Sequence, residues 1–160
     1  MTRAFVALGS NLDEPVAQIR AAFAALATLE GCRIVKTSSL YRTAPIGYLD
    51  QADFINAAVE LDCALTPHRL LQGLLAIESD FGRLRTFRNA PRVLDLDLLW
   101  FEGIRLDDET LTLPHPRLHL RSFVLTPLCE IAPDLTVGEL GRVDHLLARL
   151  EDQGVVRLTE

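Results

Sequence analysis

The chain has 160 residues and a formal net charge of −6; 49% of its residues are hydrophobic and 24% are charged. This length and balance predict one folded domain over residues 1–160 and argue against a disordered chain. A general nucleic-acid binder would be basic, a membrane helix would need an apolar run of roughly 18 residues, and a secreted protein would begin with a signal peptide, so we expect a cytoplasmic protein that binds neither nucleic acid nor membrane.

The first part of the chain predicts a strand, a helix and a second strand. Residues 3–9 form a short apolar run that ends at a glycine, as in a central strand. Asp13 is the predicted N-cap, and Pro15 a predicted first-turn residue, of a helix over residues 14–29. Gly31 ends this helix, and the β-branched segment 32–43 predicts one continuous second strand.

The next part of the chain repeats this order. Residues 53–63 predict a third strand, and Thr66 and Pro67 predict the start of an amphipathic helix that Gly82 ends. Residues 93–101 predict a fourth strand, and residues 104–106 an extra strand that pairs back against it. A proline-marked segment at residues 113–135, a short helix at 143–151 and a terminal strand at 155–158 follow.

The resulting order, β-α-β-β-α-β followed by C-terminal additions, predicts an α+β fold. Two such β-α-β halves form an antiparallel four-stranded sheet with both helices on one face. We expect the other face of the sheet to be open and to carry loops and a ligand.

The three cysteines, Cys32, Cys63 and Cys129, have neither CxxC nor metal-site spacing. An odd number of cysteines in a chain without a signal peptide is typical of reduced thiols. We expect all three to be buried.

Two aspartates lie one residue apart in the predicted fourth strand. Alternation places Leu94, Leu96, Leu98 and Trp100 toward a core, and Asp95 and Asp97 together on the opposite face. Carboxylates about 6.5 Å apart repel each other unless a cation lies between them, and such pairs can hold two divalent ions for phosphoryl chemistry. Oxygen ligands favour Mg²⁺ over Zn²⁺. The alternative interpretation is the solvated face of an ordinary half-exposed strand.

Four arginines precede the aspartates within ten residues and favour the metal interpretation. They are Arg83, Arg85, Arg88 and Arg92. On a bare surface these guanidinium groups would repel one another, whereas a polyphosphate would relieve the repulsion. The alternative is a set of surface ion pairs with nearby acids such as Asp80, each worth little.

With these residues the sequence resembles the 6-hydroxymethyl-7,8-dihydropterin pyrophosphokinases of folate synthesis. The stretch "RNAPRVLDLDLL" matches the signature of that family. The blocks "GSNL", "SSLYRTAPIG", "DFINAAVEL", "IESDFGRLR" and "LTLPHPRLHLRSFVLTPLCEIAPDL" extend the resemblance over nearly the whole chain. The resemblance implies a ferredoxin-like α+β fold, in agreement with the order derived above.

The resemblance also implies a reaction and a role for individual residues. ATP transfers its pyrophosphoryl group to the hydroxymethyl oxygen of the dihydropterin, with two Mg²⁺ ions, and AMP leaves. Asp95 and Asp97 are then the metal ligands, and Arg83 and Arg92 the catalytic arginines. The implied ATP-binding residues are Glu78, Arg85, Arg88, Leu98, Thr112, His115 and Arg121, and the implied pterin-binding residues are Thr43, Ile46, Phe54, Asn56 and Phe123. No residue stands out as a general base.

Two departures from the family pattern are visible, and other classes of function stay open. Asn89 and Ala90 replace the usual Trp-Gly of the segment that covers the site, and Pro116 replaces a usual Tyr. The alternatives are a magnesium-dependent phosphohydrolase with the same carboxylates, or a ferredoxin-like RNA-binding module. Low aromatic content and negative charge argue against the module. We expect a monomer.

Overall fold

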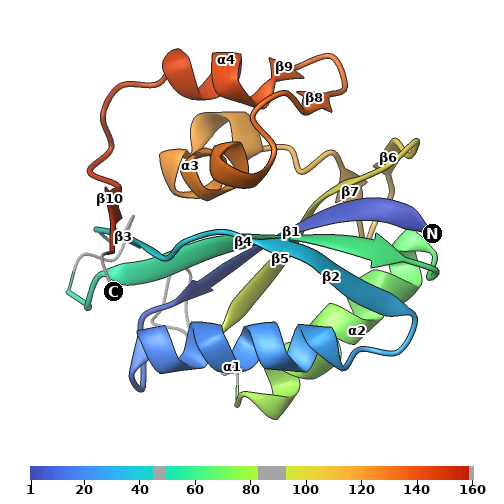
Figure 1. Ribbon diagram of the computed structural model, residues 1–160, viewed down its shortest axis with the longest axis horizontal. Helices are drawn as coiled ribbons and strands as arrows, with labels where there is room; N and C mark the ends of the chain where they lie inside the picture. The colour runs from blue at the N-terminus through green and yellow to red at the C-terminus, as the bar shows by residue number, and fades with distance from the viewer. Residues whose placement is uncertain (45–49, 83–92, 159–160) are drawn as a thin grey trace.

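The computed structural model describes residues 1–44, 50–82 and 93–158 (Figure 1). Its first part runs in the order β1 (Thr2–Ser10), α1 (Pro15–Ala27), β2 (Cys32–Thr37), β3 (Tyr41–Thr43), β4 (Phe54–Cys63), α2 (Pro67–Asp80) and β5 (Asp95–Phe101). The C-terminal part contains β6 (Leu106–Asp107), β7 (Thr112–Leu113), the 3-10 helix η1 (Leu118–Leu120), α3 (Ser122–Ile131), β8 (Thr136–Val137), β9 (Gly141–Arg142), α4 (Val143–Ala148) and β10 (Val156–Arg157).

The main sheet is antiparallel, with strand order β10-β3-β4-β1-β5, and β2 also pairs with β4. Strand β1 is central and pairs with β4 over its whole length, from Thr2 opposite Cys63 to Ser10 opposite Ile55. Together with the two helices, this is the ferredoxin-like arrangement, so the predicted fold class is confirmed. Among the described residues, no helix is long and apolar enough to cross a membrane.

The predicted second strand is wrong in one respect, because it is broken into β2 and β3. Both pieces pair with β4, and Ser38 lies between them. The buried Ser38 hydroxyl accepts a hydrogen bond from the Ala58 N–H at 2.8 Å, in place of a main-chain partner. A side chain that takes over a main-chain hydrogen bond in this way interrupts regular pairing.

Helices α1 and α2 cover one face of the sheet, as predicted (Figure 1). Their buried residues, including Ile19, Leu26, Leu70 and Leu74, pack against the inward side chains of β1 and β4 in one hydrophobic cluster. Thr66 caps α2 as predicted and accepts a hydrogen bond from the Arg69 N–H. The predicted cap of α1 is wrong.

At the start of α1, Glu14 and not Asp13 occupies the cap position, and neither side chain makes a cap hydrogen bond. Both residues have positive φ, 54° for Asp13 and 61° for Glu14. The Asp13 carbonyl instead accepts a hydrogen bond from the Gln18 side-chain amide at 3.0 Å.

The other face of the sheet is covered by the C-terminal part and is not open as expected. Helix α3 lies over it, with α4 packed on the outer side of α3 (Figure 1), and a second hydrophobic cluster joins Phe5, Ala58 and Leu99 of the sheet to Leu125 and Leu128 of α3. Sequence patterns indicated no clear helix here, because Pro127 lies inside α3. The buried apolar face of α3 outweighs the hydrogen bond that proline removes.

Strand β5 contains a bulge that corrects the predicted orientation of Trp100. Val6 is opposite Leu98 and Phe5 is opposite Trp100, so Leu99 is the extra residue. Leu96 and Leu98 therefore pack on the helix α1–α2 side as predicted, whereas Leu99 and Trp100 both pack on the α3 side. The strand predicted at residues 104–106 also differs, because β6 pairs with β7 in a separate sheet.

The three cysteines are free, but only Cys63 is fully buried. Cys32 lies directly opposite Cys63 in the β2–β4 ladder, and the two Sγ atoms are 2.9 Å apart. Burial, followed by the neighbouring Cys63 thiol, raises the pKa of Cys32 to about 12. At neutral pH the Cys32 thiol is therefore protonated. The spacing of the cysteines in the sequence did not indicate that Cys32 lies opposite Cys63.

Candidate active site

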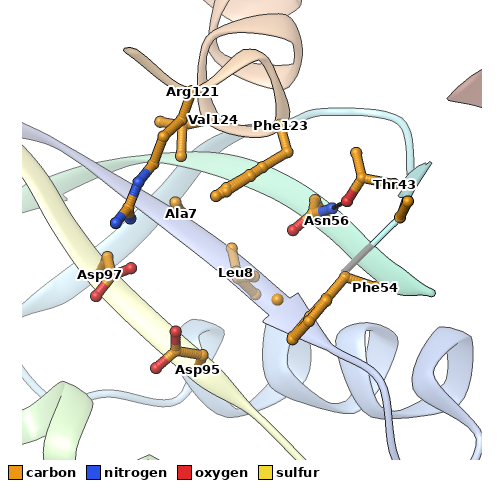
Figure 2. A pocket seen from close by; sticks show the side chains of 12 residues that line it. Ala7, Leu8, Thr43, Phe54, Asn56, Asp95, Asp97, Arg121, Phe123 and Val124 are labelled. Carbon is orange, nitrogen blue, oxygen red and sulfur yellow. Dashed lines mark hydrogen bonds between the residues drawn. The ribbon is translucent and has the colours of Figure 1, made fainter. Parts of the chain in front are cut away.

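A cavity of about 160 Å³ lies between the sheet and the start of α3. β1, β4 and β5 contribute one wall, β3 closes one end, and α3 contributes the other wall (Figure 2). The lining residues are Ala7, Leu8, Gly9, Thr43, Ala44, Phe54, Asn56, Asp95, Asp97, Arg121, Phe123 and Val124. Seven predicted site residues are among them, although they span residues 43–123 of the sequence.

One end of the cavity is acidic. Asp95 and Asp97 project from the same face of β5, and both are half-buried, while Leu94, Leu96 and Leu98 are buried on the other side. The predicted placement of the two carboxylates is therefore confirmed. Among residues 1–44, 50–82 and 93–158, no group of three or more His, Cys, Asp or Glu side chains could hold a metal ion.

A buried carboxylate lies beneath this acidic end. Glu78 of α2 is 2% exposed, and its Oε2 atom accepts a hydrogen bond from the Leu96 N–H at 2.6 Å. Leu96 lies between the two aspartates, so Glu78 fixes the outer edge of β5 where they project. Glu78, predicted to contact ATP, does not line this cavity.

Arg121 connects the acidic and aromatic ends of the cavity. Its guanidinium carbon lies 5.5 Å from the centroid of the Phe123 ring, and its guanidinium group points toward Asp97 (Figure 2). A cation in this position stands above a ring face and faces a carboxylate. The arrangement places positive charge where an anionic group near the aspartates would meet it.

The opposite end of the cavity is aromatic. The rings of Phe54 and Phe123 come from the two opposing walls and both face the cavity (Figure 2). Beside them, Asn56 Nδ2 donates a hydrogen bond to Thr43 Oγ1 at 2.8 Å, and both side chains are buried. Two ring faces with an amide and a hydroxyl at the rim can hold a flat, polar heterocycle.

Gly9 is a site residue that the analysis of single residues missed. A Cβ atom on Gly9 would lie 3.3 Å from Asn56 Oδ1 and 3.9 Å from the Phe54 ring. The lack of a side chain therefore leaves room for the amide and the ring. The available signal was a glycine at the end of the predicted central strand, in the block "GSNL".

Thr112 and His115 line a second cavity of about 520 Å³. The His115 N–H donates to the Leu99 carbonyl at 2.8 Å, which ties this segment to β5. Burial, then the charges of Arg121 and Arg117, lower the pKa of His115 to about 4 against the opposing effect of Asp95. His115 is therefore neutral at pH 7 and lies within electrostatic reach of the acidic end.

The Leu98 side chain is buried in the core and faces away from the cavity. Its main-chain groups face the same outer edge of β5 as those of Leu96, two residues before it. Leu98 could therefore contact a ligand only through its backbone.

Five predicted site residues lie outside the residues that the structure describes. They are Ile46, Arg83, Arg85, Arg88 and Arg92.

The sequence and the fold are both similar to those of known proteins. A model of the 7,8-dihydro-6-hydroxymethylpterin-pyrophosphokinase family matches residues 5–133. The 2-amino-4-hydroxy-6-hydroxymethyldihydropteridine pyrophosphokinase of Methylorubrum extorquens is 48% identical over 158 residues, 99% of each chain. The Pseudomonas aeruginosa protein of the same name is 45% identical over 156 residues, 98% of this chain and 96% of that protein.

A crystal structure of Plasmodium falciparum HPPK-DHPS with pteroate has the same fold. It superimposes with a TM-score of 0.73 at 15% identity, over 92% of this chain. The match spans only 42% of that longer protein, so it bears on the fold alone.

Proposed function

This chain belongs to the 7,8-dihydro-6-hydroxymethylpterin-pyrophosphokinase family, and from that premise we propose how its cavity holds the two substrates. The enzyme transfers the pyrophosphoryl group of ATP to 6-hydroxymethyl-7,8-dihydropterin, a step of folate synthesis. The hydroxymethyl oxygen bonds to the β-phosphorus of ATP and its proton is released to water, the bond from that phosphorus to the oxygen shared with the α-phosphate breaks, and AMP leaves.

The observation that carries the assignment is that one cavity has an acidic end and an aromatic end, with Arg121 between them. The pterin ring lies between Phe54 and Phe123, and Thr43 and Asn56 meet its polar edge. In this orientation the hydroxymethyl group points toward Asp95 and Asp97, where the triphosphate of ATP is held. Backbone at Ile46, outside the described residues, completes the pterin site.

Asp95 and Asp97 fit magnesium. Mg²⁺ is held in proteins by one or two carboxylates together with substrate phosphates and water, and two half-buried carboxylates on one strand face match that donor set. We assign two ions to this pair. When bound, the ions supply positive charge that offsets the charge developing on the phosphoryl oxygens.

The remaining cations act on the nucleotide. Arg83 and Arg92, which lie outside the described residues, are assigned to the transferring phosphates, and Arg85 and Arg88 to ATP binding. Arg121 places positive charge where the pterin and the triphosphate of ATP meet. Thr112, neutral His115 and the backbone of Leu98 line the nucleotide side, and Glu78 supports that edge of β5 from beneath.

The chain is expected to work as a cytoplasmic monomer. The cytoplasm supplies ATP, the pyrophosphoryl donor of the proposed reaction. Size measurement in solution at assay concentrations tests the oligomeric state.

A direct test of the reaction is AMP formation by the purified chain with and without the hydroxymethyl pterin. We expect AMP only when the pterin and Mg²⁺ are both present. Release of inorganic phosphate from ATP without pterin would instead identify a phosphohydrolase, the alternative that uses the same carboxylates.

The metal assignment predicts that Asp95→Asn and Asp97→Asn each lower turnover by at least about 100-fold, because each removes a negative ligand without changing side-chain size. Circular dichroism checks that both variants remain folded, and Asp134→Asn, at an exposed position between α3 and β8, is the matched control. Full activity in either variant would rule out the metal role of that residue.

A further inference from the structure

The two walls of the proposed pterin site come from separate parts of the chain. Phe54 and Asn56 belong to β4 and Thr43 to β3, whereas Phe123 belongs to the first turn of α3. A flat ring gains most from two aromatic faces when both lie at contact distance, and a gap of 0.5–1 Å already loses a quarter to a half of the attraction. The position of α3 over the sheet therefore decides how tightly the site binds the pterin ring.

Glu130, near the end of α3, makes a polar connection to β3 and the segment before it. Its Oε1 atom accepts hydrogen bonds from Tyr41 Oη at 2.6 Å and from the Ser39 N–H at 2.9 Å. Its Oε2 atom accepts from the Ser39 N–H and the Ser39 hydroxyl, both at 3.1 Å. Arg157 of β10 adds an ion pair, with its Nη2 atom 3.9 Å from Glu130 Oε2.

The position of Glu130 relates this connection to the cavity. Glu130 follows Phe123 by seven residues, about two helical turns, so both side chains lie on the same side of α3. Tyr41 and Thr43 are alternate residues of β3 and are both buried, and they pair with Asn56 and Phe54 of β4, respectively. The same two elements thus carry the Glu130 contact at one end and the walls of the cavity at the other.

The Glu130 carboxylate stays ionised at neutral pH. Burial raises its pKa, but the hydrogen bonds from Tyr41 and Ser39 and the charge of Arg157 lower it more, so that the pKa lies below the ordinary value. Hydrogen bonds to an ionised acceptor are roughly twice as strong as neutral ones. Of the described side chains of α3, Glu130 is the one whose charge is fixed against β3 in this way.

We propose that Glu130 is a positioning residue for the pterin substrate, which sets the spacing between Phe123 and Phe54 by holding α3 to β3. This inference rests on the proposed pterin site. In this role Glu130 differs from the residues that contact the substrate, because its carboxylate acts only by holding α3 in position.

The test is substrate binding by Glu130→Gln, which keeps the size of the side chain and removes its charge. In the presence of Mg²⁺ and a saturating non-hydrolysable ATP analogue, the pterin Kd should rise about tenfold, because a carboxylate bonded by several donors becomes an amide with a single acceptor oxygen. The Kd for the ATP analogue alone should change less than twofold. The exposed Glu151 provides the control Glu151→Gln, which should change neither constant.

Tyr41→Phe is the second variant, since it removes one donor and keeps the buried ring. It should raise the pterin Kd by about threefold. In the double variant, the increase of the pterin Kd should be smaller than the product of the two single increases, because both changes act on one contact. All constants are measured well below the unfolding transition of each variant. A role in overall stability alone would lower the unfolding midpoint and leave the pterin Kd unchanged there.

The outcomes separate this inference from the proposed function. Wild-type protein that binds no pterin would overturn the assigned site itself. Wild-type protein that binds pterin, with Glu130→Gln and Tyr41→Phe binding equally well, would overturn only the role of Glu130. If Glu130→Gln does not fold, the pterin Kd of Tyr41→Phe decides the question.

Discussion

A carboxylate on a strand can be a metal ligand or an ordinary surface group. For Asp95 and Asp97, only the neighbouring residues distinguish these two interpretations. Alternation placed both on one face, and the structure confirms this. The Phe54 and Phe123 pair could equally have been core residues. Their common cavity follows from the packing of α3, which no local pattern near either phenylalanine indicates.

The same limit applies to Glu78, which the resemblance assigned to ATP. Glu78 is 2% exposed and its carboxylate accepts a hydrogen bond from the Leu96 N–H, so in the structure it supports β5 and does not line the cavity. A residue number carried over from a family cannot tell whether a side chain contacts the ligand or supports the strand that does.

Arg92 is expected to act on the chemical step, since it precedes Asp95 by three residues. Arg92→Ala should lower kcat by about 100-fold or more and change the pterin Kd less than threefold, because the lost charge matters most when charge develops on the phosphates. Steady-state kinetics with a separate pterin binding measurement checks this. The opposite pattern, weak pterin binding with normal kcat, would assign Arg92 to binding.

His115 predicts a pH dependence of stability. Its pKa falls from the ordinary histidine value of 6.5 to about 4 in the folded chain, and protonation would also remove the hydrogen bond that Nδ1 accepts from the Arg117 N–H. Between these values the unfolded chain binds a proton that the folded chain does not. The stabilisation is therefore complete above about pH 6.5 and is lost as the pH falls toward about 4.

Denaturant unfolding at about pH 7 and about pH 5 measures this effect. His115→Gln should lose less free energy of unfolding between the two pH values than the wild type. His145→Gln, at an exposed position on α4, is the control and should keep the wild-type difference. Equal differences in all three proteins would show that His115 does not carry this dependence.

At the scale of elements, local patterns were reliable where hydrophobic spacing and end signals agreed. Helix α2 has its capping threonine, its proline and its terminal glycine at the predicted places. The failures have separate physical causes. Ser38 broke the second strand through a side-chain hydrogen bond, and burial of α3 overrode Pro127. Both causes depend on residues distant in sequence.

The cap of α2 gives a stability prediction. Thr66→Ala should lower the free energy of unfolding by about 1 kcal/mol, because the Arg69 N–H loses its acceptor. Thr66→Ser keeps a hydroxyl at this position and should stay within about 0.5 kcal/mol of the wild type. Urea unfolding followed by circular dichroism is the measurement, and equal stability of the alanine and serine variants would contradict a capping role.

At the scale of the whole molecule, one sheet separates two hydrophobic clusters. Leu74 is fully buried on the α1–α2 side and Leu125 on the α3 side. Both clusters use β1, β4 and β5, so neither can lose its packing without disturbing the shared sheet. This sharing supports the proposal that residues 1–160 unfold as one domain.

Two probes can test that proposal. Leu74→Ala and Leu125→Ala should each cost about 2–5 kcal/mol. Trp100, the single tryptophan, reports on the α3 side by fluorescence, and circular dichroism reports on the whole chain. The two signals should change together in each variant. A fluorescence transition at lower denaturant in Leu125→Ala alone would make the C-terminal part a separate unit.

The bulge at Leu99 limits where β5 can become shorter. Removal of one residue from a regular strand turns the side chains on one side of the gap to the opposite face. Loss of Leu99 would restore plain alternation and leave both aspartates, Trp100 and Phe101 on their present faces, whereas loss of Leu96 would turn Asp95 into the core. Functional relatives with a one-residue deletion in this strand should therefore carry the gap at the bulge and never between the two acids.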